Sequence, residues 1–186
     1  MKIISLYNNE KQLIRKSISG KREAQQRLYE KYSPLMLSVC RRYVKDVHFA
    51  EDVMVSGFVK VFKSLNSFRG EGSFEGWIRK IMVRECISHL RKNQFVVFDD
   101  CAFEESDFKT QNENQLDAEY IQHLIDALPD GYRTVFVLYA VEGYKHQEIA
   151  QELGISQSTS KSQLFKARKW LQEKLKEQNS IGHATR

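Results

Sequence analysis

The sequence is short of the residues that mark several protein classes. It has only 2 prolines in 186 residues, and no apolar run approaches the roughly 18 residues that a membrane-spanning helix requires. The first residues, MKIISLYNNEKQ, hold too few apolar side chains for a secretory signal. We therefore expect a cytoplasmic protein with no membrane insertion of its own.

Cysteine and histidine patterns that would support catalysis or metal binding are also missing. Cys40, Cys86 and Cys101 are odd in number, widely spaced and without a C-x-x-C pair, which argues against a disulfide framework and a local zinc site. The 5 histidines have no metal-ligand spacing, and no Ser/His/Asp or Cys/His grouping occurs. We expect reduced thiols, no cofactor, no metal, no catalytic residue and no enzymatic activity.

What the sequence does have is charge, and the charge is divided into three blocks. Residues 1–95 hold 19 Lys/Arg against 9 Asp/Glu, residues 96–130 hold 1 against 10, and residues 131–186 hold 9 against 5. Two basic blocks around an acidic one predict two modules that bind polyanions. Nucleic acid is favoured over a membrane surface, because neither terminus has a Lys-rich helix with an apolar face.

Apolar residues recur at helical spacing in two regions, residues 20–93 and 114–178. In the first region we predict a short helix over about 20–32, a second that starts at Ser33 and Pro34, and two more over about 49–65 and from Ser73. No strand pattern of useful length occurs. The prediction is an all-α chain of two small helical bundles joined by an acidic linker over 94–113, with a 1–19 extension and a 179–186 tail.

The stretch SFRGEGSFEGW has three glycines and at first resembles a phosphate-binding loop. Its G-x-G-x-x-x-G spacing misses the dinucleotide fingerprint by one residue, it follows a helix rather than a strand, and Glu71 and Glu75 would repel phosphate. We predict instead a reversal between two helices, in which Gly70 and Gly72 adopt backbone shapes that other residues resist and Ser73 caps the next helix.

The stretch HQEIAQELGISQSTSKSQLFKARKWL, residues 146–171, is typical of a helix-turn-helix. Gly154 supplies the left-handed turn position, and Ser156 caps the second helix. The second helix then presents hydroxyls and cations on its exposed side, as major-groove binding requires. The predicted exposed residues are Thr159, Lys161, Ser162, Phe165, Lys166 and Arg168.

Together these stretches resemble the RNA polymerase sigma factors of the extracytoplasmic-function (ECF) group in the sigma-70 family. The likeness covers about residues 20–175. It rests on LYEKYSPLM, AEDVMVSGFVKVFKSL and FRGEGSFEGWIRKIMVRECISHLRK in the first module. In the second module it rests on IDALPDGYRTVFVLYAVEGYKHQEIAQELGIS and KSQLFKARKWL. The modules stand in the order of sigma domains 2 and 4.

The resemblance implies a bacterial protein that binds core RNA polymerase and promoter DNA, with an anti-sigma factor as a further partner. The helix-turn-helix would read the −35 element as duplex. The −10 element would be captured as a melted single strand by a loop and a polar helix stripe, at Asn66, Ser67, Arg69, Glu71, Lys80, Arg84, Ser88 and Arg91. The polymerase-binding residues would be Glu51, Asp52, Val55 and Ser56.

Several positions depart from the family pattern. Val55 and Ser56 stand where a Gln and an acid are usual, Ser160 replaces a core Val, and Gln163 replaces an Arg, so that a cation is lost and promoter preference is expected to change. The resemblance would also place the linker carboxylates on basic polymerase surfaces; they are Asp99, Asp100, Glu104, Glu105 and Asp107. The rival hypothesis is a DNA-binding regulator whose first module serves as a sensor or dimerisation domain.

Overall fold

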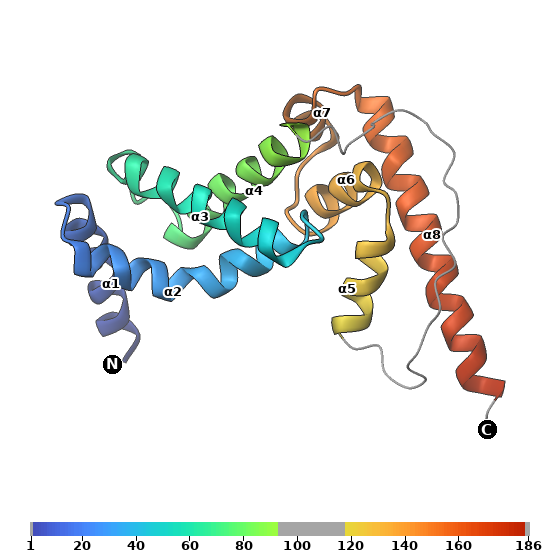
Figure 1. Cartoon of the computed structure of the whole chain (residues 1–186), viewed down its shortest axis with the longest axis horizontal. Helices are drawn as coiled ribbons and strands as arrows, with labels where there is room; N and C mark the ends of the chain where they lie inside the picture. Colours follow the sequence, from blue (N-terminus) through green and yellow to red (C-terminus); the bar gives the residue numbers. More distant parts are fainter. Residues whose placement is uncertain (1, 93–117, 185–186) are drawn as a thin grey trace. The chain divides into compact units, whose positions relative to one another are not determined.

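The computed structural model describes residues 2–92 and 118–184. Within these ranges every regular element is a helix: α1 Lys2–Ile18, α2 Arg22–Arg41, α3 Val47–Ser64, the short 3-10 helix η1 Leu65–Ser67, α4 Phe74–Lys92, α5 Ala118–Ala127, α6 Asp130–Ala140, α7 His146–Leu153 and α8 Gln157–Ala184 (Figure 1). The chain divides into two compact units, Met1–His89 and Leu90–Arg186. The prediction of an all-α protein with two helical bundles is confirmed. Among the described helices, none combines the length and apolarity needed to span a bilayer.

Helix α2 runs without a break through Pro34, which corrects the prediction of two helices that meet at Ser33 and Pro34. Proline inside a helix removes one backbone hydrogen bond and costs about 3 kcal/mol. Against this cost stands an uninterrupted buried stripe on both sides of the proline, formed by Ala24, Leu28, Tyr32, Met36 and Val39. Burying four large side chains yields about 1.5–3 kcal/mol each, so the stripe outweighs the proline.

Helix α1 forms in the segment 1–19, for which the sequence predicts only an extension. It packs against α2 and contacts η1. Ile14 and Ser17 are buried, and the turn into α2 passes through Gly20 at φ +78°. The N-terminal segment is therefore part of the first unit.

The core of the first unit is closed by a close approach of α3 and α4. A Cβ atom at Gly57 would lie 2.3 Å from Sδ of Met82, a distance that no real pair of such atoms shows. Cys40 and Cys86 are free thiols in the same core. The pKa of the Cys86 thiol is raised, mainly by a hydrogen bond with Cys40 and next by burial. Both buried side chains act as small apolar groups.

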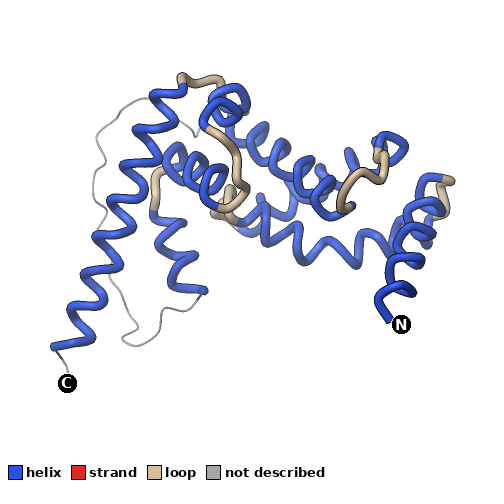
Figure 2. The backbone as a smooth tube through the Cα atoms, turned by 180° about the vertical axis from the view of Figure 1, so that it is seen from behind, coloured by secondary structure: helices blue, strands red, loops and turns tan. Residues whose placement is uncertain are grey.

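The second unit is organised around α8, which packs against α5, α6 and α7 (Figure 2). Its apolar core includes Leu124, Leu128, Tyr132, Ala167 and Trp170. Leu124 and Leu128 are buried one turn apart, in agreement with the helical periodicity predicted for residues 114–178. The core packs against one side of α8, and the opposite side of this helix is exposed.

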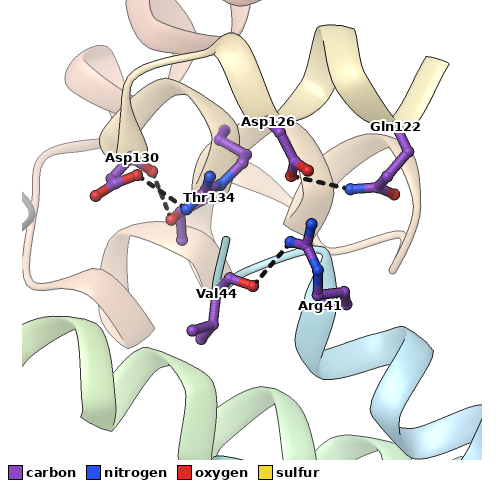
Figure 3. A network of polar contacts seen from close by, with 7 residues as sticks. Arg41, Val44, Gln122, Asp126, Asp130 and Thr134 are labelled. Atoms are coloured by element: carbon purple, nitrogen blue, oxygen red, sulfur yellow. Dashed lines mark hydrogen bonds and ion pairs between the residues drawn. The ribbon is translucent and has the colours of Figure 1, made fainter. Parts of the chain in front are cut away.

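Short polar contacts hold the helix ends (Figure 3). In the first turn of α6, the Thr134 hydroxyl donates to the backbone carbonyl of Asp130 over 2.6 Å, and the Arg133 guanidinium donates to Oδ1 of Asp130 over 2.9 Å. At the end of α2, Arg41 donates to the carbonyl of Val44 over 3.1 Å. Each contact joins two residues three or four positions apart, at the start of α6 or the end of α2.

Candidate nucleic-acid interface

The turn between α7 and α8 has the geometry that the sequence predicts. Gly154 adopts φ +70°, and its N–H donates to the carbonyl of Ala150 over 2.9 Å. The N–H of Ile155 donates to the same carbonyl over 3.1 Å. The Ser156 hydroxyl then accepts the N–H of Thr159 over 2.9 Å and caps α8. The left-handed glycine and the serine cap are both confirmed.

The six residues predicted to face DNA form two adjacent stripes on α8. Lys161, Phe165 and Arg168 are exposed and follow the i, i+4, i+7 spacing of one helix face. Thr159, Ser162 and Lys166 follow i, i+3, i+7 spacing along the neighbouring stripe; the first two are half-buried and Lys166 is exposed. Phe165 is 69% exposed, the largest fraction among the exposed large apolar residues of the described chain.

One flank of this surface is held by a stack of side chains. The guanidinium of Arg168 lies 5.2 Å from the ring centre of Tyr139, and that ring stacks on His146 at 4.7 Å. Nδ1 of His146 lies 2.9 Å from Oγ of Ser160. The stack links α6, α7 and α8, and it gives Arg168 a protein contact besides any role toward DNA.

Two departures from the family pattern look different in the structure. Ser160 is fully buried, and the hydrogen bond with His146 satisfies its hydroxyl. Gln163 is 1% exposed and lies on the packed side of α8. Gln163 therefore does not belong to the exposed face of α8, and its expected effect on promoter preference stays a prediction.

The glycine loop is an exposed turn of the first unit, between η1 and α4. Gly70 and Gly72 adopt φ +77° and +107°, and the Ser73 hydroxyl accepts the N–H of Gly76 over 3.0 Å, which confirms the predicted turn and cap. The four candidate residues here are exposed, with Asn66 and Ser67 in η1 and Arg69 and Glu71 in the turn. The Ser67 hydroxyl already donates to the carbonyl of Ser64 over 2.7 Å, so only its lone pairs are left for a ligand.

Helix α4 carries the predicted polar stripe beyond this loop. Lys80, Arg84, Ser88 and Arg91 recur at intervals of four, four and three residues, which places them along one helix face. Lys80, Arg84 and Arg91 are exposed, and Ser88 is half-buried. The stripe is a row of cations that starts near the glycine loop.

The candidate polymerase-binding residues share an exposed face of α3. Glu51, Asp52, Val55 and Ser56 are all exposed, with Val55 at 48%. Sequence reasoning missed Val59, which is 47% exposed one turn after Val55. The signal was present, because Val59 falls outside the apolar stripe of α3 and a valine there is left uncovered.

The linker carboxylates Asp99, Asp100, Glu104, Glu105 and Asp107 lie outside the described residues, as does Cys101. Across the described ranges 2–92 and 118–184, no group of three or more His, Cys, Asp or Glu side chains is placed to hold a metal ion.

Comparison with known proteins gives two family matches, one in each unit. Residues 28–96 match the family described as sigma-70 region 2, and residues 118–171 match sigma-70, region 4. The RNA polymerase sigma factor SigV of Bacillus subtilis (strain 168) is 31% identical over 134 residues, which cover 72% of this chain and 80% of that protein. The RNA polymerase sigma-H factor of Pseudomonas aeruginosa is 26% identical over 180 residues, which cover 89% of this chain and 93% of that protein.

A solved structure has a similar fold. It is titled a co-crystal of the sigma factor RpoE in complex with the anti-sigma factor NepR from Bartonella quintana, and it aligns with a TM-score of 0.52 at 24% identity. The alignment covers 81% of this chain and 96% of that one.

A helix-turn-helix in one bundle, preceded by a second bundle of a matched family, defines a DNA-binding transcription factor. The chain belongs to the ECF group of the sigma-70 family of RNA polymerase sigma factors. Such factors bind core RNA polymerase and promoter DNA to start transcription, and they are not enzymes. The resemblance inferred from the sequence is thereby confirmed.

Proposed function

We propose that this chain directs polymerase to promoters by reading DNA in two forms, the −35 element as duplex and the −10 element as a melted single strand. The observation that carries the proposal is the 69% exposure of Phe165 on a helix-turn-helix face that also presents Lys161 and Arg168. An exposed phenylalanine between cations is unfavourable in water, and it fits a surface that DNA covers.

The exposed face of α8 has the groups that duplex readout needs. Lys161 can reach guanine acceptors or phosphates, and Phe165 can contact a thymine methyl group in the major groove. Thr159 and Ser162 add hydroxyls from the adjacent stripe, and Lys166 adds a cation. Because the Ser156 cap and the Arg168 stack hold α8 at its start and along one flank, we expect the binding of DNA to this face to carry a small ordering cost.

The glycine loop and α4 fit a single strand better than a duplex. Unstacking a base costs a few kcal/mol, which a pocket for the flipped base can offset. Asn66 at η1, and Arg69 and Glu71 in the exposed turn that follows, supply an amide, a guanidinium and a carboxylate, a set that can pair with the edge of a base. The cations Lys80, Arg84 and Arg91 can follow the phosphates of the same strand.

The α3 face fits a partner helix of the polymerase. Val55 and Val59 form an apolar pair one turn apart, and Glu51 and Asp52 lie on the same exposed side. This is an apolar centre with an acidic rim, the usual anatomy of a protein interface. Where glutamine is usual, Val55 would make apolar contacts with the partner helix in place of hydrogen bonds.

The proposed division of labour follows the units. Residues 20–93 bind polymerase and the −10 strand, residues 114–178 bind the −35 duplex, and the linker 94–113 connects them. The chain acts on RNA polymerase in the cytoplasm. Because the solved relative is titled as a complex with an anti-sigma factor, we also propose that a protein of this kind holds this chain inactive.

A double variant tests the assignment of α8. Lys161→Ala with Phe165→Ala should lower initiation from a promoter mapped for the wild-type chain by at least tenfold, since each good base contact is worth about 1–3 kcal/mol. Binding to core polymerase should stay at the wild-type level. Lys169→Ala with Gln172→Ala, two exposed residues further along α8, is the matched control. Loss of polymerase binding in the first variant would mean that the surface is misassigned.

A further inference from the structure

Helix α1 has no role in the function proposed above, yet its Glu10 makes two contacts with α2. The Glu10 carboxylate accepts hydrogen bonds from Lys31 and from the hydroxyl of Tyr32. Tyr32 is 5% exposed, and the side chain of Glu10 is 24% exposed. Burial alone would raise the pKa of Glu10, but the hydrogen bonds from Lys31 and Tyr32 lower it below its usual value. The pKa of Tyr32 is raised, by burial and by the hydrogen bond to Glu10. Glu10 is thus held as a carboxylate and Tyr32 as a donor.

The ring of Tyr32 connects this pair to the glycine loop. It lies edge-on to Phe74, the first residue of α4, with ring centres 5.6 Å apart. Phe74 is 2% exposed and follows directly after the loop. Glu10 of α1 is therefore linked to the end of the loop through two side chains, Tyr32 and Phe74.

The other end of the loop meets the same rings. Phe68, which precedes Arg69, packs edge-on to Phe74 at 5.0 Å, and Trp77 lies 5.6 Å from both Phe68 and Phe74. The N–H of Phe68 also donates to the carbonyl of Leu65 over 3.1 Å. Residues 69–73 thus leave and re-enter the unit at one aromatic cluster, formed by Phe68, Phe74 and Trp77. The five loop residues themselves are exposed.

We propose that Glu10 and Tyr32 are positioning residues for the glycine loop, which they hold in a base-receiving shape through the aromatic cluster. The proposal rests on the function proposed for this loop. Gly70 and Gly72 make the loop conformationally permissive, so its shape must be set from outside. The cluster fixes the distance between the two ends, and the Tyr32 hydroxyl bond fixes the ring on which Phe74 rests. A base that enters a preset loop does not have to supply the energy to order it.

Glu10 does not act by its charge on DNA. Lys31 forms an ion pair with it, so the charges of these two side chains offset each other. What Glu10 contributes is an acceptor for Tyr32. A glutamine keeps such an acceptor, whereas an alanine does not, and this difference separates positioning from electrostatics.

The experiment uses holoenzyme assembled from core polymerase and the full chain. The probe is an oligonucleotide with the non-template −10 sequence of a promoter mapped for the wild-type chain, with 2-aminopurine at the base expected to flip. The variants are Tyr32→Phe, which keeps the ring and removes the hydroxyl, Glu10→Ala and Glu10→Gln. The fluorescence increase of the flipped base gives the affinity for the single strand.

Tyr32→Phe and Glu10→Ala should each weaken capture roughly fivefold, the worth of one hydrogen bond. Glu10→Gln should remain near wild type, and the double variant Glu10→Ala with Tyr32→Phe should be no weaker than either single one. Core affinity and −35 duplex binding should not change. If Tyr32→Phe and Glu10→Ala both capture the strand as well as the wild type does, the inference is overturned while the proposed function stands. The same holds if Glu10→Gln loses as much affinity as Glu10→Ala. No capture by the wild-type holoenzyme overturns the proposed function, and the inference with it.

Discussion

At the scale of single residues, the hydrogen bond between Ser160 and His146 links α8 to α7. Family members usually have valine where this chain has Ser160, and a buried hydroxyl without a partner costs about 1–3 kcal/mol. His146 supplies that partner at 2.9 Å and stacks on Tyr139, which also lies under Arg168. One polar substitution in the core is thus tied to the exposed face of α8.

This arrangement predicts a pH dependence of stability. Burial first, and then the charges of Lys161 and Arg168, lower the pKa of His146 below 6.5. The unfolded chain therefore binds this proton more readily than the folded one, so the contribution of His146 to stability is present above about pH 6.5 and is lost as the pH falls through the folded-state pKa. Urea unfolding of the full chain at pH 7.5 and 5.5, followed by near-UV signals of the second unit, measures it.

The matched control is His146→Gln, which keeps a hydrogen-bonding group toward Ser160 but does not titrate. The stability difference between pH 7.5 and 5.5 should be smaller in this variant than in the wild type. An equal difference in both proteins would show that other groups cause the pH dependence.

At the scale of the elements, the start of α8 depends on a single side chain. The hydroxyl of Ser156 accepts the N–H of Thr159, whereas Ser158 contacts only the hydroxyl of Ser156 among the bonds described for it. Ser156→Ala should reduce the free energy of unfolding by about 1 kcal/mol, the usual worth of such a cap. Ser158→Ala removes an equally exposed hydroxyl and should change it by less than about 0.5 kcal/mol. Equal effects in chemical denaturation would contradict the cap assignment.

The pairing of α3 with α4 makes a second prediction at this scale. Gly57→Ala places a methyl group against Met82, which should destabilise the first unit by about 1–3 kcal/mol even though alanine is the better helix former. In a Met82→Ala background the clash disappears, and Gly57→Ala should then be neutral or stabilising. Thermal unfolding of the four proteins measures this coupling, and additive effects would show that α3 and α4 do not meet there.

The elements also show what sequence reasoning can and cannot reach. The turn at Gly154, the cap at Ser156 and the glycine loop were predictable, because each depends on local chemistry within a few residues. The break at Pro34 was wrong because local chemistry favours one and only tertiary burial of the surrounding stripe overrides it. The contact of Tyr32 with Phe74 joins α2 to the aromatic cluster, a long-range pairing that no local pattern encodes.

For the candidate site, exposure was harder to predict than composition. Phe165 was expected to be exposed because it lies opposite the buried stripe of α8, and it is. Gln163 stands where an arginine is usual, and it is buried; the sequence does not indicate this, because a single polar residue beside an apolar stripe is compatible with either environment. The roles assigned to these residues remain proposals that the variants above test.

At the scale of the whole molecule, electrostatics should dominate DNA affinity. The net charge is +5 despite the acidic linker, and α4 presents a row of cations. Lys80→Ala should therefore lower the magnitude of the slope of log affinity against log salt by roughly 0.7 for single-stranded −10 DNA. Lys80→Arg keeps the charge and should leave the slope unchanged. A slope unaffected by Lys80→Ala would remove this residue from the strand path.

The central claim is that both units act together on one polymerase at one promoter. The most direct measurement is in-vitro transcription with purified core RNA polymerase on a template whose start site is mapped after the chain is overproduced. We predict specific initiation at that site only when this chain is added, with permanganate-reactive thymines at −10. A chain that binds duplex DNA but neither associates with core polymerase nor opens the template would contradict the claim and favour a regulator that uses the second unit alone.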